Sequence, residues 1–587
     1  MAHGTSVTVS DPAGLIRALE ASGRFRRDTR LGGILHPGEI SFRENSPSNS
    51  LHVTIVGNRV RAHVDEVSPL DCESHGSRQY SLSRVVVHNL AVLVEDLGRR
   101  ARGLHGRQRC TLECEAVWVD EDPAPEGEGT GAGRDVSFVP FGIVDQAIHL
   151  LDTEPSPWSI QLEVRVTGHL DETRLRDAVS HALARHPLAR AREVSSGGWR
   201  SRHQWEIPPG PGVDVDPVHV VECVDDRSLA TARAELQSTP IPLEQSPPLR
   251  LWLARHPRGD VVMLSVSHAA MDGFGALRVL ESVARAYAGQ ADPAPAVELT
   301  EARALPAHLD RTGLSTRVRR YLALADKLRD VVVPTARLAP DGEDDDAGYG
   351  FHHVALSRSR TRSLTELDHA GTVNDVLLAA LHLAIAEWNA DHGTPAERIG
   401  VLVPANLRPA QWRGDMAGNF TLPARVATTA TNRSTPAAAL AAVTRCTRRK
   451  KSVGMGTALL ELLSRTQSLP LWAKRATVAL LPATGNRLVD TAMLSNLGRL
   501  DDPPSFGPDA GRVTEAWFSP PGRMPLGLTV GVVTVSGRLH LVFRYQHRLF
   551  GPGAARRFAN GYLAQLERLV ADEPNIRAAH PVRRLSA

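Results

Sequence analysis

The sequence has few cysteines, little net charge and no long apolar run, and each shortage excludes a class of protein. Five cysteines are scattered through 587 residues without metal-ligand spacing, which favours a reducing cytoplasm and gives a metal site no support. A net charge of +3 excludes a chain that binds nucleic acid through its overall charge. No apolar run approaches the length of a membrane span. We therefore expect a cytoplasmic protein with no transmembrane segment, no metal and no bound cofactor.

What the sequence does have is enough length for several domains, with 42% hydrophobic and 23% charged residues, as in soluble globular proteins. A linker rich in Gly, Pro and Glu is expected over 121–134, because this stretch is too polar to pack. It separates an N-terminal module, 1–120, from the rest. For this module the patterns predict helices near 12–21 and 82–102 and strands near 32–43, 51–66 and 108–119.

These elements make the module a compact α+β domain without a catalytic pattern. Partner docking, dimerisation and coverage of the remaining lobes are all open roles for it. A second, weaker boundary lies between 289 and 350, where Pro- and Ala-rich sequence precedes the acidic run 341–346. We expect a crossover there between an N-terminal lobe, 135–345, and a C-terminal lobe, 346–587.

The most informative pattern is SHAAMDG at 267–273. The apolar run 261–266 before it predicts a buried strand, and an amphipathic helix is expected to begin near Gly275. A neutral histidine, with an ordinary pKa of about 6.5, can take a proton from a hydroxyl or amine while that group attacks a carbonyl. His268 at the end of a rigid strand suits this work. The alternative is a structural histidine whose hydrogen bonds are satisfied in the core.

Two neighbours of the histidine suggest support for it. Asp272 can accept a hydrogen bond or pair with an arginine, which would hold the backbone that carries His268. Gly273 allows another chain or a thin substrate to pass close by. Arg408 lies between a predicted strand and a proline turn, and a buried pair with Asp272 is one interpretation of it; a surface arginine is the other.

Further patterns extend over the rest of the chain. A strand over 160–166 precedes a helix that begins after Asp171 or Thr173 as N-cap and ends before Pro187. A second helix is expected to begin within 371–380, with Thr372 or Asn374 as its N-cap. Six further segments follow in order along the chain: GTVNDVLLAA at 371–380, VPANLRP at 403–409, MAGNF at 416–420, LSNLGRL at 494–500, GLTV at 527–530 and RLHLVFRY at 538–545.

In this order and spacing the segments resemble the chloramphenicol-acetyltransferase-like superfamily over about 135–587. This superfamily includes the condensation domains of nonribosomal peptide synthetases, polyketide-associated acyltransferases, wax-ester synthases and plant acyltransferases. The resemblance implies an α/β (α+β) fold of two lobes with a central tunnel, in addition to the small N-terminal α+β domain.

The resemblance also implies roles for individual residues. His268 would act as general base in the tunnel, with an acyl thioester entering from one side and a nucleophile from the other. Asp272, paired with Arg408, would be structural. Ser267 and Asn496 would line the tunnel, although Asn496 also allows a purely local role in satisfying the backbone.

The predicted function is therefore an acyltransferase that forms an ester or amide in specialised-metabolite or lipid biosynthesis. The co-substrate would be acyl-CoA or an acyl-phosphopantetheinyl carrier. In the second case an acyl or peptidyl carrier protein would be the partner that delivers the acyl group. Ser267 stands where condensation domains have a first histidine, which argues against a peptide-elongating domain. The alternative is a catalytically silent condensation-like protein that docks a biosynthetic partner. A thioester hydrolase lacks the expected Gly-x-Ser-x-Gly elbow.

Overall fold

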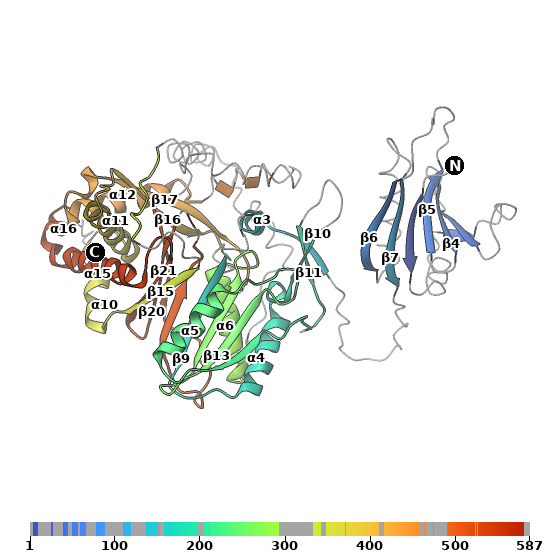
Figure 1. Ribbon diagram of the computed structural model, residues 1–587, viewed down its shortest axis with the longest axis horizontal. Coiled ribbons are helices and arrows are strands. Elements are labelled where there is room, and N and C mark those ends of the chain that lie inside the picture. Colours follow the sequence, from blue (N-terminus) through green and yellow to red (C-terminus); the bar gives the residue numbers. More distant parts are fainter. Residues whose placement is uncertain are drawn as a thin grey trace, which may run out of the picture. The chain divides into compact units, whose positions relative to one another are not determined.

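The computed structural model divides the chain into two units, Met1–Asp135 and Val136–Ala587 (Figure 1). In the first unit the structure describes the backbone of seven strands. In the second it describes residues 137–150, 152, 158–195, 203–210, 212–292, 333–341, 348–369, 371–409, 412, 416–456, 459, 460, 463, 464, 474, 490–522, 524 and 526–579.

The first unit contains a mixed sheet in the order β2-β3-β4-β5-β1-β7-β6. β1 pairs with β7 in parallel, β7 pairs with β6 in parallel, and the other neighbours are antiparallel. The strands are β1 Gly4–Val9, β2 Phe25–Arg27, β3 Glu39–Glu44, β4 Ser50–Val56, β5 Arg59–Asp65, β6 Arg78–Val87 and β7 Cys110–Trp118.

Two expectations for this unit are corrected. The helix expected near 82–102 is wrong where it begins, because residues up to Val87 belong to β6, and the run Val85-Val86-Val87 favours a strand. The single strand expected over 51–66 is two antiparallel strands, β4 and β5, separated by Gly57-Asn58, a pair typical of hairpin turns. The strand expected near 108–119 is confirmed as β7. The helix expected near 12–21 lies outside the described residues.

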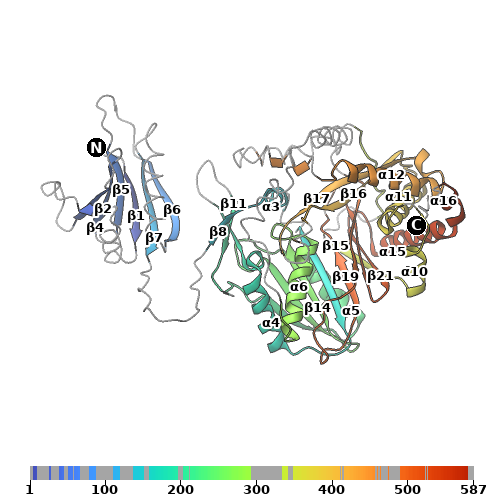
Figure 2. The same ribbon diagram turned by 180° about the vertical axis from the view of Figure 1, so that it is seen from behind.

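The second unit contains a five-stranded sheet in the order β12-β13-β14-β9-β19. Its strands are β9 Ser159–Val166, β12 Val218–Glu222, β13 Leu249–Arg255, β14 Val261–Ser267 and β19 Val513–Ser519. Because side chains alternate along a strand, Leu162 and Val164 face the core under α4 (Glu172–Arg185) and α6 (Gly273–Tyr287). Met263 faces α5 (Asp226–Ser238) on the other side. The sheet is thus covered by helices on both faces, with α4 and α6 packed together (Figure 2).

Local sequence explains where these helices begin. Asp171 is the N-cap of α4, and its carboxylate accepts a hydrogen bond from the Arg174 backbone N–H at 2.7 Å. The helix ends at Arg185, before Pro187, as the sequence predicts. α11 (Val373–Asp391) begins after Thr372, whose backbone N–H donates to the Asp375 carboxylate at 2.7 Å. Of the two residues expected to cap this helix, Thr372 is therefore the N-cap.

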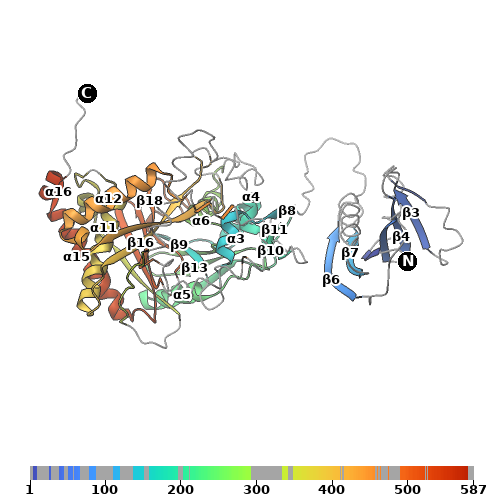
Figure 3. The same cartoon turned by 90° about the horizontal axis from the view of Figure 1, so that it is seen from above.

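This unit also contains a six-stranded sheet in the order β15-β21-β20-β18-β16-β17. Its strands are β15 Tyr349–Ala355, β16 Arg398–Asn406, β17 Thr421–Thr429, β18 Ala492–Leu500, β20 Leu528–Val535 and β21 Arg538–Gln546. Its helices are α10 Arg358–Thr365, α11, α12 Pro436–Ser452, α15 Pro552–Ala571 and α16 Glu573–Ala579. α11, α12 and α15 lie on the far side of this sheet from β9 and β13 (Figure 3).

One strand joins the two sheets. β19 follows β18 in the chain and lies within 346–587, the range expected to form the second lobe. It nevertheless pairs with β9 in the five-stranded sheet. It also packs against β20 and β21. Gly531 in β20 permits this close approach, because a side chain there would overlap the Phe518 carbonyl oxygen. None of the described helices is long and apolar enough to cross a bilayer.

Buried neutral histidines should make the second unit acid-sensitive. Burial, above all other causes, lowers the pKa of His186 and of His382 to about 3. The unfolded chain, with an ordinary histidine pKa of about 6.5, binds more protons than the folded one between pH 6.5 and 3. Stability is therefore complete above pH 6.5 and falls as the pH drops below it. Denaturant unfolding should give a lower free energy of unfolding at pH 5 than at pH 7, and a smaller difference for His382→Gln. Equal stability at both pH values would contradict this.

Candidate active site

His268 is the first residue after β14. Its backbone N–H donates to the Trp158 carbonyl at 2.9 Å, and Ala270 N–H donates back to the Ser267 carbonyl at 3.1 Å. These bonds form a tight turn between the strand and α6. His268 as a whole residue is half-buried. The predicted strand before it and helix after it are both confirmed.

The hydrogen bonds of the ring define its tautomer. Nδ1 of His268 lies 3.2 Å from the Met271 carbonyl oxygen. Because a carbonyl only accepts, Nδ1 must carry the proton, and Nε2 then carries the lone pair of the neutral ring. Burial lowers the pKa of His268 by more than the Asp272 charge and the Met271 carbonyl raise it. The imidazole is therefore held in its neutral, basic form.

Asp272 is the N-cap of α6, and its carboxylate collects hydrogen bonds from three directions. Oδ1 accepts from the Gly275 backbone N–H at 2.9 Å. Oδ2 accepts from the Phe420 N–H at 3.0 Å and from the Thr421 hydroxyl at 2.8 Å. Asp272 is 2% exposed, so these bonds replace its hydration.

Arg408 completes the partners of this carboxylate. Its two terminal nitrogens lie 2.8 and 2.7 Å from the two oxygens of Asp272, a bidentate pair between buried side chains. The guanidinium also donates to the Gly418 carbonyl at 3.0 Å and lies over the Phe420 ring at 4.7 Å. Burial would raise the pKa of Asp272, but the Arg408 charge and the hydrogen bonds lower it below its ordinary value. The structure thus brings together the two residues that the sequence paired.

Two supporting residues were missed by sequence reasoning. The side-chain amide of Asn419 donates to the His268 and Ala269 carbonyls, each at 2.8 Å, and to Asp145 Oδ1 at 3.1 Å. Asp145 also accepts from Trp205 Nε1 at 3.1 Å. Together Asn419 and Asp145 hold the turn at His268 and Ala269 in place. Asn419 was part of a segment matched in the sequence, but nothing there assigned it a partner, and Asp145 lies in no matched motif.

Gly273 and Gly275 permit close packing at the start of α6. A Cβ at Gly273 would lie 3.0 Å from Phe518 and 3.1 Å from Leu497. A Cβ at Gly275 would lie 2.9 Å from the Gly418 backbone nitrogen. The segment that carries Asn419 can approach the helix because this position has no side chain. The atoms nearest to a Cβ at Gly273 are side chains of this chain; that a substrate passes beside this glycine stays a prediction.

Ser267 and Asn496 both have local partners. Ser267 is 3% exposed, and its hydroxyl accepts from the Ala269 N–H at 3.3 Å. Asn496 Oδ1 accepts from the Gly498 N–H at 2.8 Å, beside an irregularity in the pairing of β18 with β20. This bond is the local role that the sequence left open for Asn496. That either residue lines a tunnel stays a prediction.

A small cavity of about 10 Å³, room for about one water molecule, lies between the two sheets. Its lining includes Gln161 and Met263 of the five-stranded sheet, Trp517 and Ser519 of β19, and His353 and Val542 of the six-stranded sheet. Met263 lies in β14 five residues before His268, which directly follows this strand. The two residues are therefore about 16 Å apart. A passage between the lobes that reaches His268 stays a prediction.

The family model of the condensation domain matches residues 146–468. The chain belongs to the condensation-domain family, and so to the chloramphenicol-acetyltransferase-like superfamily that the motifs indicated. It is therefore a transferase-like protein of the acyl-transferring, condensing class. Two uncharacterised proteins from two strains of Mycobacterium tuberculosis are each 34% identical over 411 residues, which cover 69% of this chain and 93% of theirs.

Solved structures share the fold of the second unit. The epimerization domain of the third module of tyrocidine synthetase B is 17% identical with a TM-score of 0.55, covering 76% of this chain and 99% of its own. The first condensation domain of the CDA synthetase is 16% identical with a TM-score of 0.57, covering 74% and 97%. The SgcC5 protein of Streptomyces globisporus is 17% identical with a TM-score of 0.54, covering 74% and 99%. The predicted mixed α/β fold is confirmed by these matches.

Removing one charge of the buried pair should destabilise the protein strongly. In Asp272→Asn the amide still caps α6, but Arg408 loses its counter-charge, a loss that typically costs about 3–5 kcal/mol in buried pairs. The matched control is Asp501→Asn, because Asp501 lies 2.6 Å from Arg499 while both side chains are more than 70% exposed. There we expect a loss below about 1 kcal/mol. Denaturant unfolding measures both, and equal losses would refute a special role for Asp272.

Proposed function

We propose that the chain is an acyltransferase in which His268 acts as general base. It moves an acyl group from a thioester to a hydroxyl or amine acceptor. The observation that carries the proposal is the hydrogen bond from Nδ1 of His268 to the Met271 carbonyl. It leaves Nε2 as a proton acceptor on a neutral ring, in a family whose class is acyl transfer.

The chemistry follows from that tautomer. Nε2 takes the proton of the acceptor O–H or N–H as the acceptor atom forms a bond to the thioester carbonyl carbon. The carbonyl π electrons move to oxygen and return as the C–S bond breaks. The imidazolium then gives its proton to the departing thiolate, so the products are an ester or amide and a free thiol. The histidine ends neutral, as it began.

Asp272 and Arg408 serve as positioning residues in this proposal. Their pair fixes the start of α6 and the segment around Asn419, which in turn holds the carbonyls of His268 and Ala269. A base must lie within hydrogen-bond reach of the proton that it takes. The pair therefore acts on the rate through the placement of the ring and not through contact with substrate.

The donor and acceptor are proposed by class. Acyl-CoA or an acyl-phosphopantetheinyl carrier supplies the thioester, and an acyl or peptidyl carrier protein is the partner in the second case. Ser267 in place of a first histidine supports a stand-alone transferase in specialised-metabolite or lipid biosynthesis over a peptide-elongating domain. The SgcC5 structure was determined with (R)-(-)-1-(2-naphthyl)-1,2-ethanediol, which supports including diols among the acceptors tested. We place the reactants in a tunnel between the lobes.

A panel of acyl thioesters with alcohols and amines, followed by mass spectrometry, tests the proposal. We expect a product with at least one pair, and a loss of about 10²–10⁴-fold in turnover for His268→Gln, because that is what a general base contributes. His181→Gln is the control, since His181 is exposed on α4, and its turnover should be unchanged. Full turnover in His268→Gln would refute the assigned base. A stable protein partner without transfer from any thioester would instead support a catalytically silent docking protein.

The pH profile gives a second test. Because burial lowers the pKa of His268, the basic form persists as the pH falls through 6.5, the ordinary histidine value. We expect kcat/KM to stay level across pH 6.5 and to fall only at lower pH, within the range where the protein stays folded. The residual rate of His268→Gln should lack this acid limb. An acid limb centred at or above pH 6.5 would contradict a buried neutral base.

A further inference from the structure

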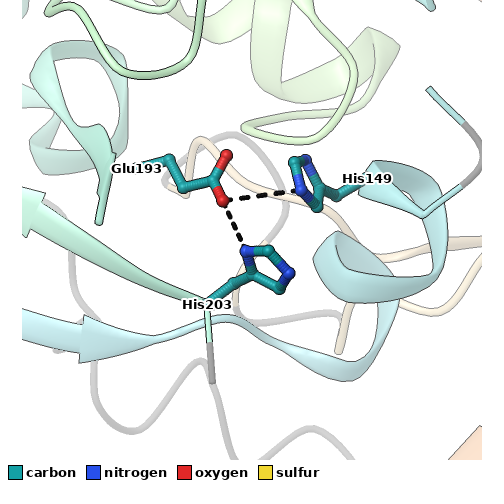
Figure 4. A group of neighbouring side chains, drawn as sticks. All are labelled: His149, Glu193 and His203. Atoms are coloured by element: carbon teal, nitrogen blue, oxygen red, sulfur yellow. Dashed lines mark hydrogen bonds and ion pairs between the residues drawn. The ribbon is translucent and has the colours of Figure 1, made fainter. Parts of the chain in front are cut away.

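Two imidazoles and a carboxylate converge away from the catalytic motif (Figure 4). His149 ends α3 (Ile143–His149), Glu193 lies in β10 (Arg192–Ser195), and His203 begins β11 (His203–Ile207). One ligand atom from each lies within 4.8 Å of the others. The His203 and Glu193 side chains are 1% and 9% exposed, and that of His149 is 21% exposed. The group is thus enclosed, with one side open.

Strand pairing and helix packing bring the group together. In the β10–β11 pair Glu193 is opposite Trp205, and Trp205 shares a face with His203 two residues earlier. α3 lies on this face, where Phe141 stacks on Trp205 at 4.2 Å and Asp145 accepts from Trp205 Nε1. One helical turn after Asp145, His149 meets His203, with 4.5 Å between ring centroids. The donors are therefore presented by a rigid support.

The donor set suits a divalent transition metal. Two imidazoles and one carboxylate are the three protein ligands of many zinc sites, which keep a fourth position for water. Ligands at about 2.1 Å from a tetrahedral ion lie about 3.4 Å from each other. His149 Nε2 lies 3.5 Å from Glu193 Oε1, which matches this spacing. Nδ1 of His203 is hydrogen-bonded to the same oxygen, closer than two ligands of one ion can lie, so these two side chains would have to move apart for one ion to meet all three.

We propose that His149, Glu193 and His203 bind one Zn²⁺ ion that joins α3 to the β10–β11 strand pair. This departs from the expectation that the protein has no metal. No step of the proposed acyl transfer uses this ion. Its effect would reach the histidine turn, because α3 also carries Asp145, and Asn419 connects Asp145 to the carbonyl of His268.

Metal binding to the full chain tests the site without any turnover. After treatment with a chelator and its removal, Zn²⁺ is added, and stoichiometry and affinity are measured by elemental analysis and competition with a chromophoric chelator. We expect one ion per chain and a higher melting temperature with Zn²⁺. Loss of a residue that only supports a ligand typically costs about 10–100-fold in metal affinity. Glu193→Gln and His149→Gln each remove a ligand, so each should weaken binding by at least as much. Neither should show the melting shift.

Two comparisons keep the result interpretable. Glu193→Gln preserves the shape of the side chain, and His149 is partly exposed, so at least one variant should remain folded by circular dichroism. His169→Gln is the matched control: Nδ1 of His169 lies 2.9 Å from an Asp260 oxygen, a histidine–carboxylate pair outside the proposed site, and its zinc binding should be unchanged. If the wild type binds no Zn²⁺, or if both site variants bind it as tightly as the wild type, the group is a hydrogen-bonded cluster and the proposal is wrong.

Discussion

The buried pair of Asp272 and Arg408 is the constraint on which the rest of the site depends. Two opposite charges with 3% and 2% of their side chains exposed carry a large desolvation cost, which is offset only by good geometry and further hydrogen bonds. Both are present: the pair is bidentate, and the carboxylate accepts from Gly275, Phe420 and Thr421 as well. Since Asp272 precedes α6 and Arg408 follows β16, the same contact ties the two sheets together.

The support of His268 works mainly through backbone carbonyls. The Met271 carbonyl holds Nδ1, and Asn419 holds the carbonyls of His268 and Ala269. Each of these groups is fixed by the helix start or by the 416–420 segment, which the buried pair anchors. A ring placed in this way needs no carboxylate at Nδ1 to define its tautomer. Burial then keeps it neutral, and that state is what a base for hydroxyl or amine acceptors requires.

Local patterns in the sequence predicted the parts of the site that are local. The strand before His268, the helix after Asp272 and the cap at Asp171 depend on neighbouring residues, and the structure has all three. The pairing of Asp272 with Arg408 came from a resemblance, since 136 residues separate them. Asp145, Asn419 and the group at His149 depend on contacts between distant segments, and no spacing in the sequence reveals those. The sequence pattern over 82–102 indicates a helix, whereas Val85-Val86-Val87 belongs to β6 and favours a strand.

A double-mutant cycle on the buried pair tests the account most directly. Asp272→Asn, Arg408→Gln and the double variant are compared with the wild type by denaturant unfolding. If the two charges stabilise each other as described, the double variant is more stable than the sum of the single losses predicts, with a coupling energy of at least about 2 kcal/mol. A coupling energy near zero would show that the two side chains act independently, and the proposed basis of the site would be wrong.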